Sequence, residues 1–144
     1  MSVKPIPTGF HTLTPYLAVN GASKLIDFLK RAFDAQENYC SKAPDGSVMH
    51  AQLKIKDSML MVSDANGAFP AMPSFIYMYV ENTDKVYNQA MQAGAISIME
   101  PADQFYGDRN AGVKDPAGNM WWIATHIEDV SEEELKKRAA ALRK

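Results

Sequence analysis

The sequence predicts an α+β protein built from two βαβββ modules, which form cup-shaped mixed sheets with helices on the outer face and are followed by a C-terminal helix. Three observations predict this fold. The order of strand, helix and three strands occurs twice, equivalent residues recur 61 positions apart, and a segment rich in Gly, Ala and Pro separates the two copies. The single domain of residues 1–144 therefore divides into module 1 (about 8–63), a linker (64–73), module 2 (about 74–127) and the C-terminal helix (about 131–143).

Module 1 begins with alternating apolar and polar residues over 11–20, which predict a strand. The residues NGAS then supply turn and capping groups, with Ser23 as the expected N-cap of a helix. Apolar residues follow at the spacing of one helical face, from Leu25 to Phe33. Three strands are predicted next, over 36–41, 48–56 and 59–63.

Module 2 repeats this order after the linker. An aromatic strand over 74–80 precedes a helix that begins at Thr83 and ends near Ala93. The third element is a strand that we expect Pro101 to end. The last two strands are predicted over 107–114 and 119–126, and the Ser131–Glu134 capping box starts the C-terminal helix.

The repeat has a consistent offset along the chain. Tyr16 matches Tyr77 and Val19 matches Val80, each 61 residues later. In the strand before the last turn of each module the offset is 58, and after that turn it returns to 61. The three-residue slip corresponds to Pro116-Ala117-Gly118, a longer turn in the second copy, which supports an internal duplication.

Charge and composition exclude several classes of function. The chain has 15 basic and 17 acidic residues, a formal charge of −2, so no basic surface for nucleic acid or for a membrane is expected. A single cysteine excludes an intramolecular disulfide framework. The first ten residues lack the apolar run of a signal peptide, and no stretch is long enough to cross a bilayer, so we expect a cytoplasmic protein.

Three segments, taken in order and at their spacing, resemble a known superfamily. They are PYLAVNGASKLIDFLKRAFDA, PDGSVMHAQLKIKDSMLMVSDA and FYGDRNAGVKDPAGNMWWIATH. The sequence is similar to the vicinal oxygen chelate superfamily, which includes glyoxalase I, bleomycin-resistance proteins and extradiol dioxygenases, and within it to the PhnB-like branch. The resemblance implies paired βαβββ modules around a cup and a homodimer, and it leaves the reaction open.

The resemblance also implies where a metal would bind. Metal-dependent members place one ligand on the first and one on the last strand of each module. In this sequence those positions are Thr14, Met61, Phe75 and Trp122. None of them is a usual ligand of a hard metal, so we expect no metal and no other cofactor. A site improvised from His50, His126 and Asp108 is the less favoured alternative.

Strand alternation predicts which side chains line the cup. Trp121 should face the helices, because its neighbours on both sides face the cup. The lining then consists of Thr14, Tyr16, Ala18, His50, Gln52, Lys54, Met59, Met61, Ser63, Phe75, Tyr77, Tyr79, Asp108, Asn110, Trp122, Ala124 and His126. From this set the expected ligand-binding residues are Tyr16, Gln52, Met61, Phe75, Tyr77, Asn110 and Trp122.

An aromatic and methionine-rich lining with a few polar groups is typical of a site for a flat, partly apolar small molecule. The first hypothesis is therefore a small-molecule-binding protein. The second is a metal-independent lyase or isomerase that acts next to a carbonyl, with His50 or Tyr16 as acid or base. The third is a cup filled by its own side chains, with an interaction role for the linker around 69–72. A local ion pair between Asp108 and Arg109 is also expected.

Overall fold

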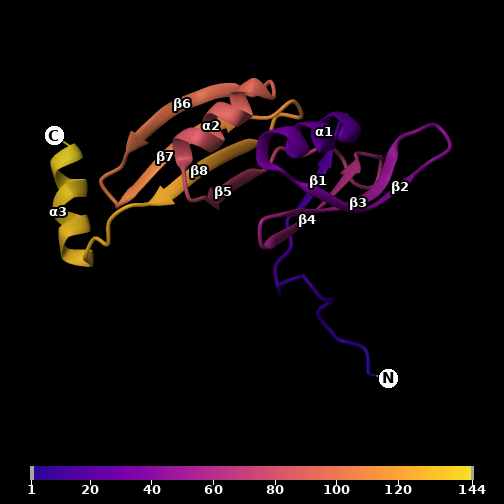
Figure 1. Cartoon of the computed structure of the whole chain (residues 1–144), viewed down its shortest axis with the longest axis horizontal. Coiled ribbons are helices and arrows are strands. Elements are labelled where there is room, and N and C mark those ends of the chain that lie inside the picture. The colour runs from indigo at the N-terminus through magenta and orange to yellow at the C-terminus, as the bar shows by residue number, and fades with distance from the viewer. Residues whose placement is uncertain (1, 144) are drawn as a thin grey trace.

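The computed structural model describes residues 2–143 and contains two four-stranded sheets, each with one helix, and a helix at the C-terminus (Figure 1). Module 1 consists of β1 (Tyr16–Val19), α1 (Ala22–Phe33), β2 (Gln36–Lys42), β3 (Val48–Ile55) and β4 (Ser58–Asp64). Module 2 consists of β5 (Phe75–Tyr79), α2 (Thr83–Gln92), β6 (Ile96–Asp103), β7 (Asp108–Lys114) and β8 (Met120–His126). The last element is α3 (Glu132–Leu142). The predicted α+β fold with two βαβββ modules is confirmed.

The two sheets have the same topology. Their strand orders are β1-β4-β3-β2 and β5-β8-β7-β6. In each sheet the first and last strands of the module are parallel, and the other pairs are antiparallel. Tyr16 pairs with Met61 in one sheet and Tyr77 pairs with Trp122 in the other, so the 61-residue offset also relates the two registers.

The start of α1 differs from the expectation that Ser23 caps it. The helix begins at Ala22, and Gly21 precedes it in the left-handed region at φ 79°. Asp64, at the end of β4, supplies the missing cap, because its Oδ1 accepts a hydrogen bond of 3.0 Å from the Ala22 N–H. Its Oδ2 accepts another of 2.7 Å from the Val48 N–H, so one carboxylate joins α1, β3 and β4.

Two strand boundaries also differ from the predictions. β1 begins at Tyr16 and not at residue 11. β6 continues through Pro101 to Asp103. Proline is tolerated there because β6 is the edge strand of its sheet and its pairing with β7 is irregular between Met99 and Ala102.

The core lies between the sheets and the helices. α1 and α2 cover the same side of the two sheets and pack against each other (Figure 1). The Phe33 ring lies 5.0 Å from the ring of Trp121, which is 2% exposed, so this contact joins the two modules. The predicted core position of Trp121 is therefore confirmed, and its Nε1 donates a 2.8 Å hydrogen bond to Asp115. In the described part of the chain, α1 and α2 both lie on one side of the sheets and leave the opposite faces without a covering helix.

Candidate functional site

The sheet faces opposite the helices carry aromatic side chains, as strand alternation predicts. On β5, Phe75, Tyr77 and Tyr79 are exposed, whereas the residues between them are half-buried. We define the module 2 face by Phe75, Tyr77, Tyr79, Tyr106, Asp108, Asn110, Trp122 and His126. We define the module 1 face by Tyr16, Tyr39, His50, Gln52 and Met61.

One half of the module 2 face is an aromatic platform. The rings of Phe75 and Trp122 stack with their centres 5.5 Å apart and an angle of 23° between their planes. Gly112 on β7 makes room for this stack, since a Cβ at that position would overlap the Trp122 indole. Phe75 remains 59% exposed, so an apolar ring of this size is available to a ligand.

The other half of the module 2 face is a hydrogen-bonded polar cluster around Asp108, whose side chain is nearly buried. Tyr77 and Tyr79 donate from their hydroxyls to Asp108 Oδ2 over 2.6 and 2.9 Å. The Nδ1 of His126 lies 2.9 Å from Asp108 Oδ1, and its Nε2 lies 2.7 Å from Asp129. The carboxylate thus has three donors, which hold the residues of β5, β7 and β8 in one arrangement.

These contacts shift the pKa values of the cluster. Burial raises the pKa of Asp108, but the hydrogen bonds from Tyr77, His126 and Tyr79 outweigh it, so the net pKa lies below the usual range. Burial and the bond to Asp108 raise the pKa of the Tyr77 hydroxyl. The bonds to Asp108 and Asp129 raise the pKa of His126. At neutral pH the aspartate is therefore charged and the phenols are protonated.

Asn110 occupies the centre of the polar cluster and is fully buried. Because Tyr77 uses its proton on Asp108, its oxygen can only accept, so the Asn110 atom 3.1 Å from it must be the amide nitrogen. The same nitrogen donates to the Tyr106 hydroxyl over 2.7 Å. The amide oxygen, Oδ1, is buried and has no hydrogen-bond partner among residues 2–143.

The expected ion pair between Asp108 and Arg109 is wrong. Arg109 binds Asp84 of α2 through two nitrogens, at 2.7 and 2.9 Å, and Asp103 at 3.0 Å. Adjacent residues of a strand point to opposite faces, so Arg109 lies on the helix side while Asp108 faces away from it.

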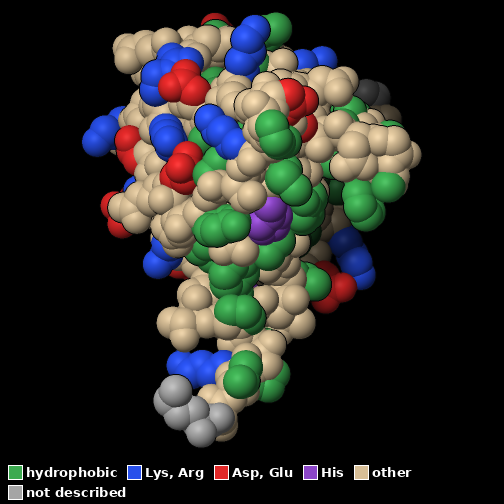
Figure 2. Space-filling view, turned by 90° about the vertical axis from the view of Figure 1, so that its right-hand side faces the viewer, with side chains coloured by type: hydrophobic (Ala, Val, Ile, Leu, Met, Phe, Trp, Pro, Cys, Tyr) green, Lys and Arg blue, Asp and Glu red, His purple; other side chains and the backbone are tan. Residues whose placement is uncertain are grey.

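The module 1 face is less connected. Its histidine, His50, lies 3.3 Å from the amide nitrogen of Gln52, and its ring centre lies 5.8 Å from that of Tyr16 and 6.2 Å from that of Tyr39. Tyr16 is 49% exposed. Figure 2, which views the molecule from the module 1 end, shows hydrophobic side chains gathered around a histidine and continuing toward the N-terminal segment. Exposed apolar residues of this part of the chain are Leu13, Tyr16, Tyr39 and Met49.

The predicted ligand-binding residues thus form two groups. Tyr16, Gln52 and Met61 belong to the module 1 face, and the others, Phe75, Tyr77, Asn110 and Trp122, belong to the module 2 face. Within residues 2–143, no hydrogen bond or ring contact joins the two groups. Tyr106 was not predicted, because it lies on the turn between β6 and β7, where strand alternation gives no signal.

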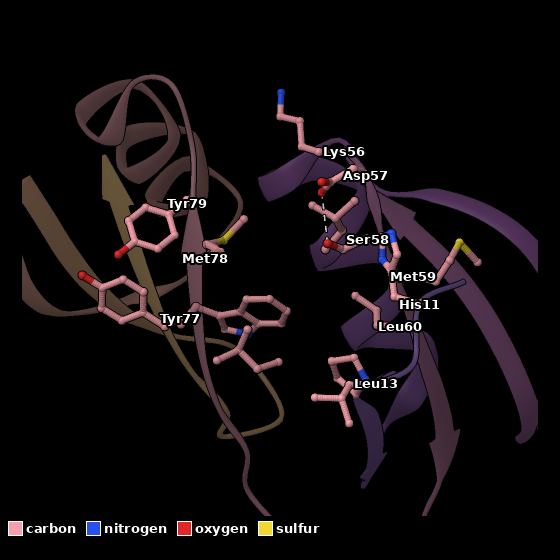
Figure 3. A pocket seen from close by; sticks show the side chains of 14 residues that line it. His11, Leu13, Lys56, Asp57, Ser58, Met59, Leu60, Tyr77, Met78 and Tyr79 are labelled. Atoms are coloured by element: carbon pink, nitrogen blue, oxygen red, sulfur yellow. Dashed lines mark hydrogen bonds between the residues drawn. The ribbon is translucent and has the colours of Figure 1, made fainter. Parts of the chain in front are cut away.

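A separate cavity of about 450 Å³ lies between the modules (Figure 3). One wall comes from β5 and Trp121 of β8, and the other from the β3–β4 turn, β4 and the segment before β1. Figure 3 shows the Tyr77 and Tyr79 hydroxyls directed away from the opposite wall, where Leu60 and Leu13 lie. The cavity therefore borders the module 2 face and does not contain its polar cluster.

The positions that would hold a metal do not fit one. Thr14 offers a hydroxyl and Met61 a thioether, and the aromatic pair on β5 and β8 offers no ligand atom. In residues 2–143 there is no group of three or more His, Cys, Asp or Glu side chains placed to bind a metal ion. The alternative site from His50, His126 and Asp108 is not formed, because His50 belongs to the other face.

No helix within residues 2–143 is long and apolar enough to cross a membrane.

Comparisons with known proteins agree with this architecture. A family model described as the glyoxalase/bleomycin resistance protein/dioxygenase superfamily matches residues 9–123. An uncharacterised protein of Mycobacterium bovis is 31% identical over 135 residues, which cover 86% of this chain and 89% of that protein. An uncharacterised protein of Mycobacterium tuberculosis has the same identity, with 79% of its length covered.

Solved structures show the same fold. TioX from Micromonospora sp. ML1 is similar with a TM-score of 0.70 and 22% identity, over 81% of this chain and 99% of that one. A glyoxalase/bleomycin resistance protein/dioxygenase family enzyme from Burkholderia phytofirmans has a TM-score of 0.63 and 18% identity, over 78% and 95% of the two chains. With the family model matching most of its length, this chain belongs to the glyoxalase/bleomycin resistance protein/dioxygenase superfamily.

Proposed function

We propose that the protein binds a small, flat, partly aromatic molecule on the module 2 face. The observation that carries this proposal is the exposed Phe75–Trp122 stack beside the polar cluster around Asp108. An open aromatic platform next to a few fixed polar groups suits a ligand that stacks and forms directed hydrogen bonds.

The pairing within the polar cluster favours binding over catalysis. Asp108 already accepts three hydrogen bonds, and both nitrogens of His126 lie against carboxylates. A general base works best with a pKa near the operating pH, whereas these hydrogen bonds hold the pKa of Asp108 below its usual range, so Asp108 is a weak base. The third hypothesis, a cup filled by its own side chains, is disfavoured by the exposure of Phe75 and Tyr16.

We further propose a homodimer in which the module 1 face of a second copy lies over the module 2 face. Each face exposes aromatic side chains, and nothing within residues 2–143 covers Phe75 or Tyr16 completely. Pairing the two faces would bring both groups of predicted ligand-binding residues into one cup. Light scattering at several protein concentrations tests this, and a monomer at all of them contradicts it.

One observation favours a second candidate function, a metal-independent lyase or isomerase acting near a carbonyl. His50 lies beside Tyr16 and has no carboxylate partner among residues 2–143, and its contact with the neutral Gln52 amide, at 3.3 Å, is one that a substrate can replace. Deuterium uptake by hydroxyacetone in D₂O, followed by NMR, tests this activity. Uptake that is catalysed by the protein and lost in His50→Gln supports it, and no uptake above the buffer rate argues against it.

The binding proposal is tested by calorimetric titration with isoquinoline, a planar bicyclic probe. We expect saturable binding that is at least about tenfold weaker in Trp122→Leu, because stacking on an aromatic side chain contributes about 1–3 kcal/mol. Phe69→Leu is the matched control, since Phe69 is an exposed aromatic residue of the linker. Binding that is absent, or unchanged in Trp122→Leu, contradicts the proposal. The PhnB-like branch and a cytoplasmic location remain predictions from the sequence.

A further inference from the structure

We propose that the module 2 face selects planar heteroaromatic molecules that carry an N–H and a C=O side by side, as in a cyclic amide, and that the side chain of Asn110 recognises this pair. The inference deepens the proposed function and rests on it, because it assumes that a flat ring binds beside the Phe75–Trp122 platform.

The first step is the unsatisfied oxygen of Asn110. The hydrogen bond from Tyr77 to Asp108 fixes the orientation of the Asn110 amide, with its nitrogen toward the two tyrosine hydroxyls. Its Oδ1 is left buried without a donor among residues 2–143. Buried polar atoms without partners are rare in native proteins because they are costly, and an N–H from a ligand would satisfy this one.

The second step is the shape of the amide edge. The oxygen and nitrogen of a carboxamide lie in one plane and present one acceptor beside one donor. A cyclic amide presents the complementary pair, so the two can form parallel hydrogen bonds, as Asn does with the edge of adenine. A molecule with only an acceptor, or only a donor, leaves half of the edge unpaired.

The third step is access, which Tyr106 controls. Its hydroxyl lies 2.7 Å from the Asn110 nitrogen, in the place that a ligand carbonyl would take. Tyr106 lies on the turn between β6 and β7, and the residue is 36% exposed, so its side chain has solvent to rotate into. The turn is closed by backbone bonds from Gln104 to Asp108 and from Gly107 to Gln104, so the side chain can leave while the backbone stays.

The fourth step is the proximity of platform and amide. Gly112, over which the Trp122 ring lies, is two residues from Asn110 on β7. Side chains two residues apart on a strand share a face and lie about 7 Å apart. A bicyclic ring can therefore contact the platform while its amide edge reaches Asn110.

The test is a calorimetric comparison of three probes of one shape: isoquinolin-1(2H)-one, its N-methyl derivative and isoquinoline. The first has the N–H and C=O pair, the second keeps the C=O but lacks the N–H, and the third has a ring-nitrogen acceptor with neither an N–H nor a C=O. We expect the unmethylated cyclic amide to bind at least about tenfold more tightly than the N-methyl compound. In Asn110→Leu, which keeps the branched shape of the side chain but is larger, the two should bind equally.

Tyr106→Phe is the second variant, in case Asn110→Leu does not fold. It retains Asn110 and removes the hydroxyl that competes with a ligand carbonyl for the Asn110 nitrogen, so it should strengthen binding of both carbonyl compounds by a few fold and preserve the preference for the unmethylated cyclic amide. Unchanged binding of both compounds contradicts the role of Tyr106, and loss of the preference contradicts the assignment of Asn110.

The outcomes separate this inference from the proposed function. If all three probes bind wild type equally, the stacking site stands and the selection by Asn110 is wrong. A preference for the cyclic amide that persists in Asn110→Leu also overturns the inference. If none of the probes binds, the proposed function fails and the inference fails with it.

Discussion

The two sheet faces derive from equivalent positions of a duplicated module, yet they are organised differently. His50 and Gln52 of module 1 correspond to Asp108 and Asn110 of module 2, at the offset of 58. Where module 2 has a carboxylate, Tyr77 donates to it over 2.6 Å. Where module 1 has an imidazole, the equivalent Tyr16 lies beside the ring at 5.8 Å between centres and forms no hydrogen bond with it.

The difference shows how the exchange of one side chain in a repeat, a carboxylate for an imidazole, can make one face ordered and leave the other adaptable. A carboxylate accepts several hydrogen bonds and so holds the neighbouring phenols and His126 in one arrangement. A face that is ordered before binding loses less entropy on binding and discriminates better between ligands. The module 1 face, with Met61 and few hydrogen bonds, can instead adapt to what lies against it.

The largest expected effect comes from breaking the aromatic platform of module 2. In Gly112→Val the new side chain overlaps the Trp122 indole, so the ring must move and its stack with Phe75 is lost. We expect a loss of about 3 kcal/mol in the free energy of unfolding and no isoquinoline binding. Thermal and urea unfolding measure the first and calorimetry the second.

Gly67→Ala is the matched control for this substitution, since nothing lies within 4 Å of a Cβ at that position. It should change stability by less than about 0.5 kcal/mol. A Gly112→Val protein as stable as the control would show that the platform is not packed as described.

The second effect comes from removing the carboxylate that distinguishes the two faces. Asp108→Asn keeps the shape of the side chain but leaves one donor of the cluster facing an amide N–H₂. We therefore expect the free energy of unfolding to fall by about 2 kcal/mol. His50→Gln places an amide side chain at the equivalent position of module 1 and should lower the free energy of unfolding by less than about 0.5 kcal/mol. Equal losses in urea unfolding would contradict the distinction between the faces.

The third effect is a pH dependence that arises from His126 on the module 2 face. Asp108 and Asp129 raise the pKa of His126 above its ordinary value of 6.5, so its protonated form is favoured in the folded state. The stabilisation is therefore fully present below pH 6.5 and is lost as the pH rises through the raised pKa of His126. His126→Gln should remove this part of the pH dependence of the melting temperature above about pH 6.5, whereas His50→Gln should retain it. A pH profile that His126→Gln leaves unchanged rules out this cause.

The smallest effect on stability is expected on the module 1 face. Met61→Ala should lower the free energy of unfolding by less than about 1 kcal/mol, because the side chain is half-buried on an open face. If the module 1 face of a second copy completes the cup, the same substitution should weaken isoquinoline binding by a few fold. Binding unchanged in Met61→Ala, measured by calorimetry, would assign the ligand to the module 2 face alone.

Strand alternation and the repeat predicted most of the fold and the side on which each residue lies. They correctly placed Trp121 among the core residues and Phe75, Tyr77 and Trp122 on the open face, because a period of two is a local property of a strand. The register between Tyr16 and Met61 also follows from the repeat.

The remaining features depend on contacts between residues distant in the sequence. The α1 cap comes from Asp64, 42 residues away, and no local pattern reports it. Tyr106 reaches Asn110 from a turn, where side-chain direction follows no period. The separation of the predicted ligand-binding residues into two groups depends on how the modules are joined, which neither periodicity nor spacing specifies.

The position of β5 has a consequence for the behaviour of the protein in solution. β5 is an end strand whose only neighbour in its sheet is β8, and its sequence, FIYMY, has no charge and no proline. Natural edge strands are usually protected by such residues, because an unpaired edge is a template for strands from other chains. The protein should therefore aggregate more readily as its concentration increases, through the backbone groups along the open edge of β5.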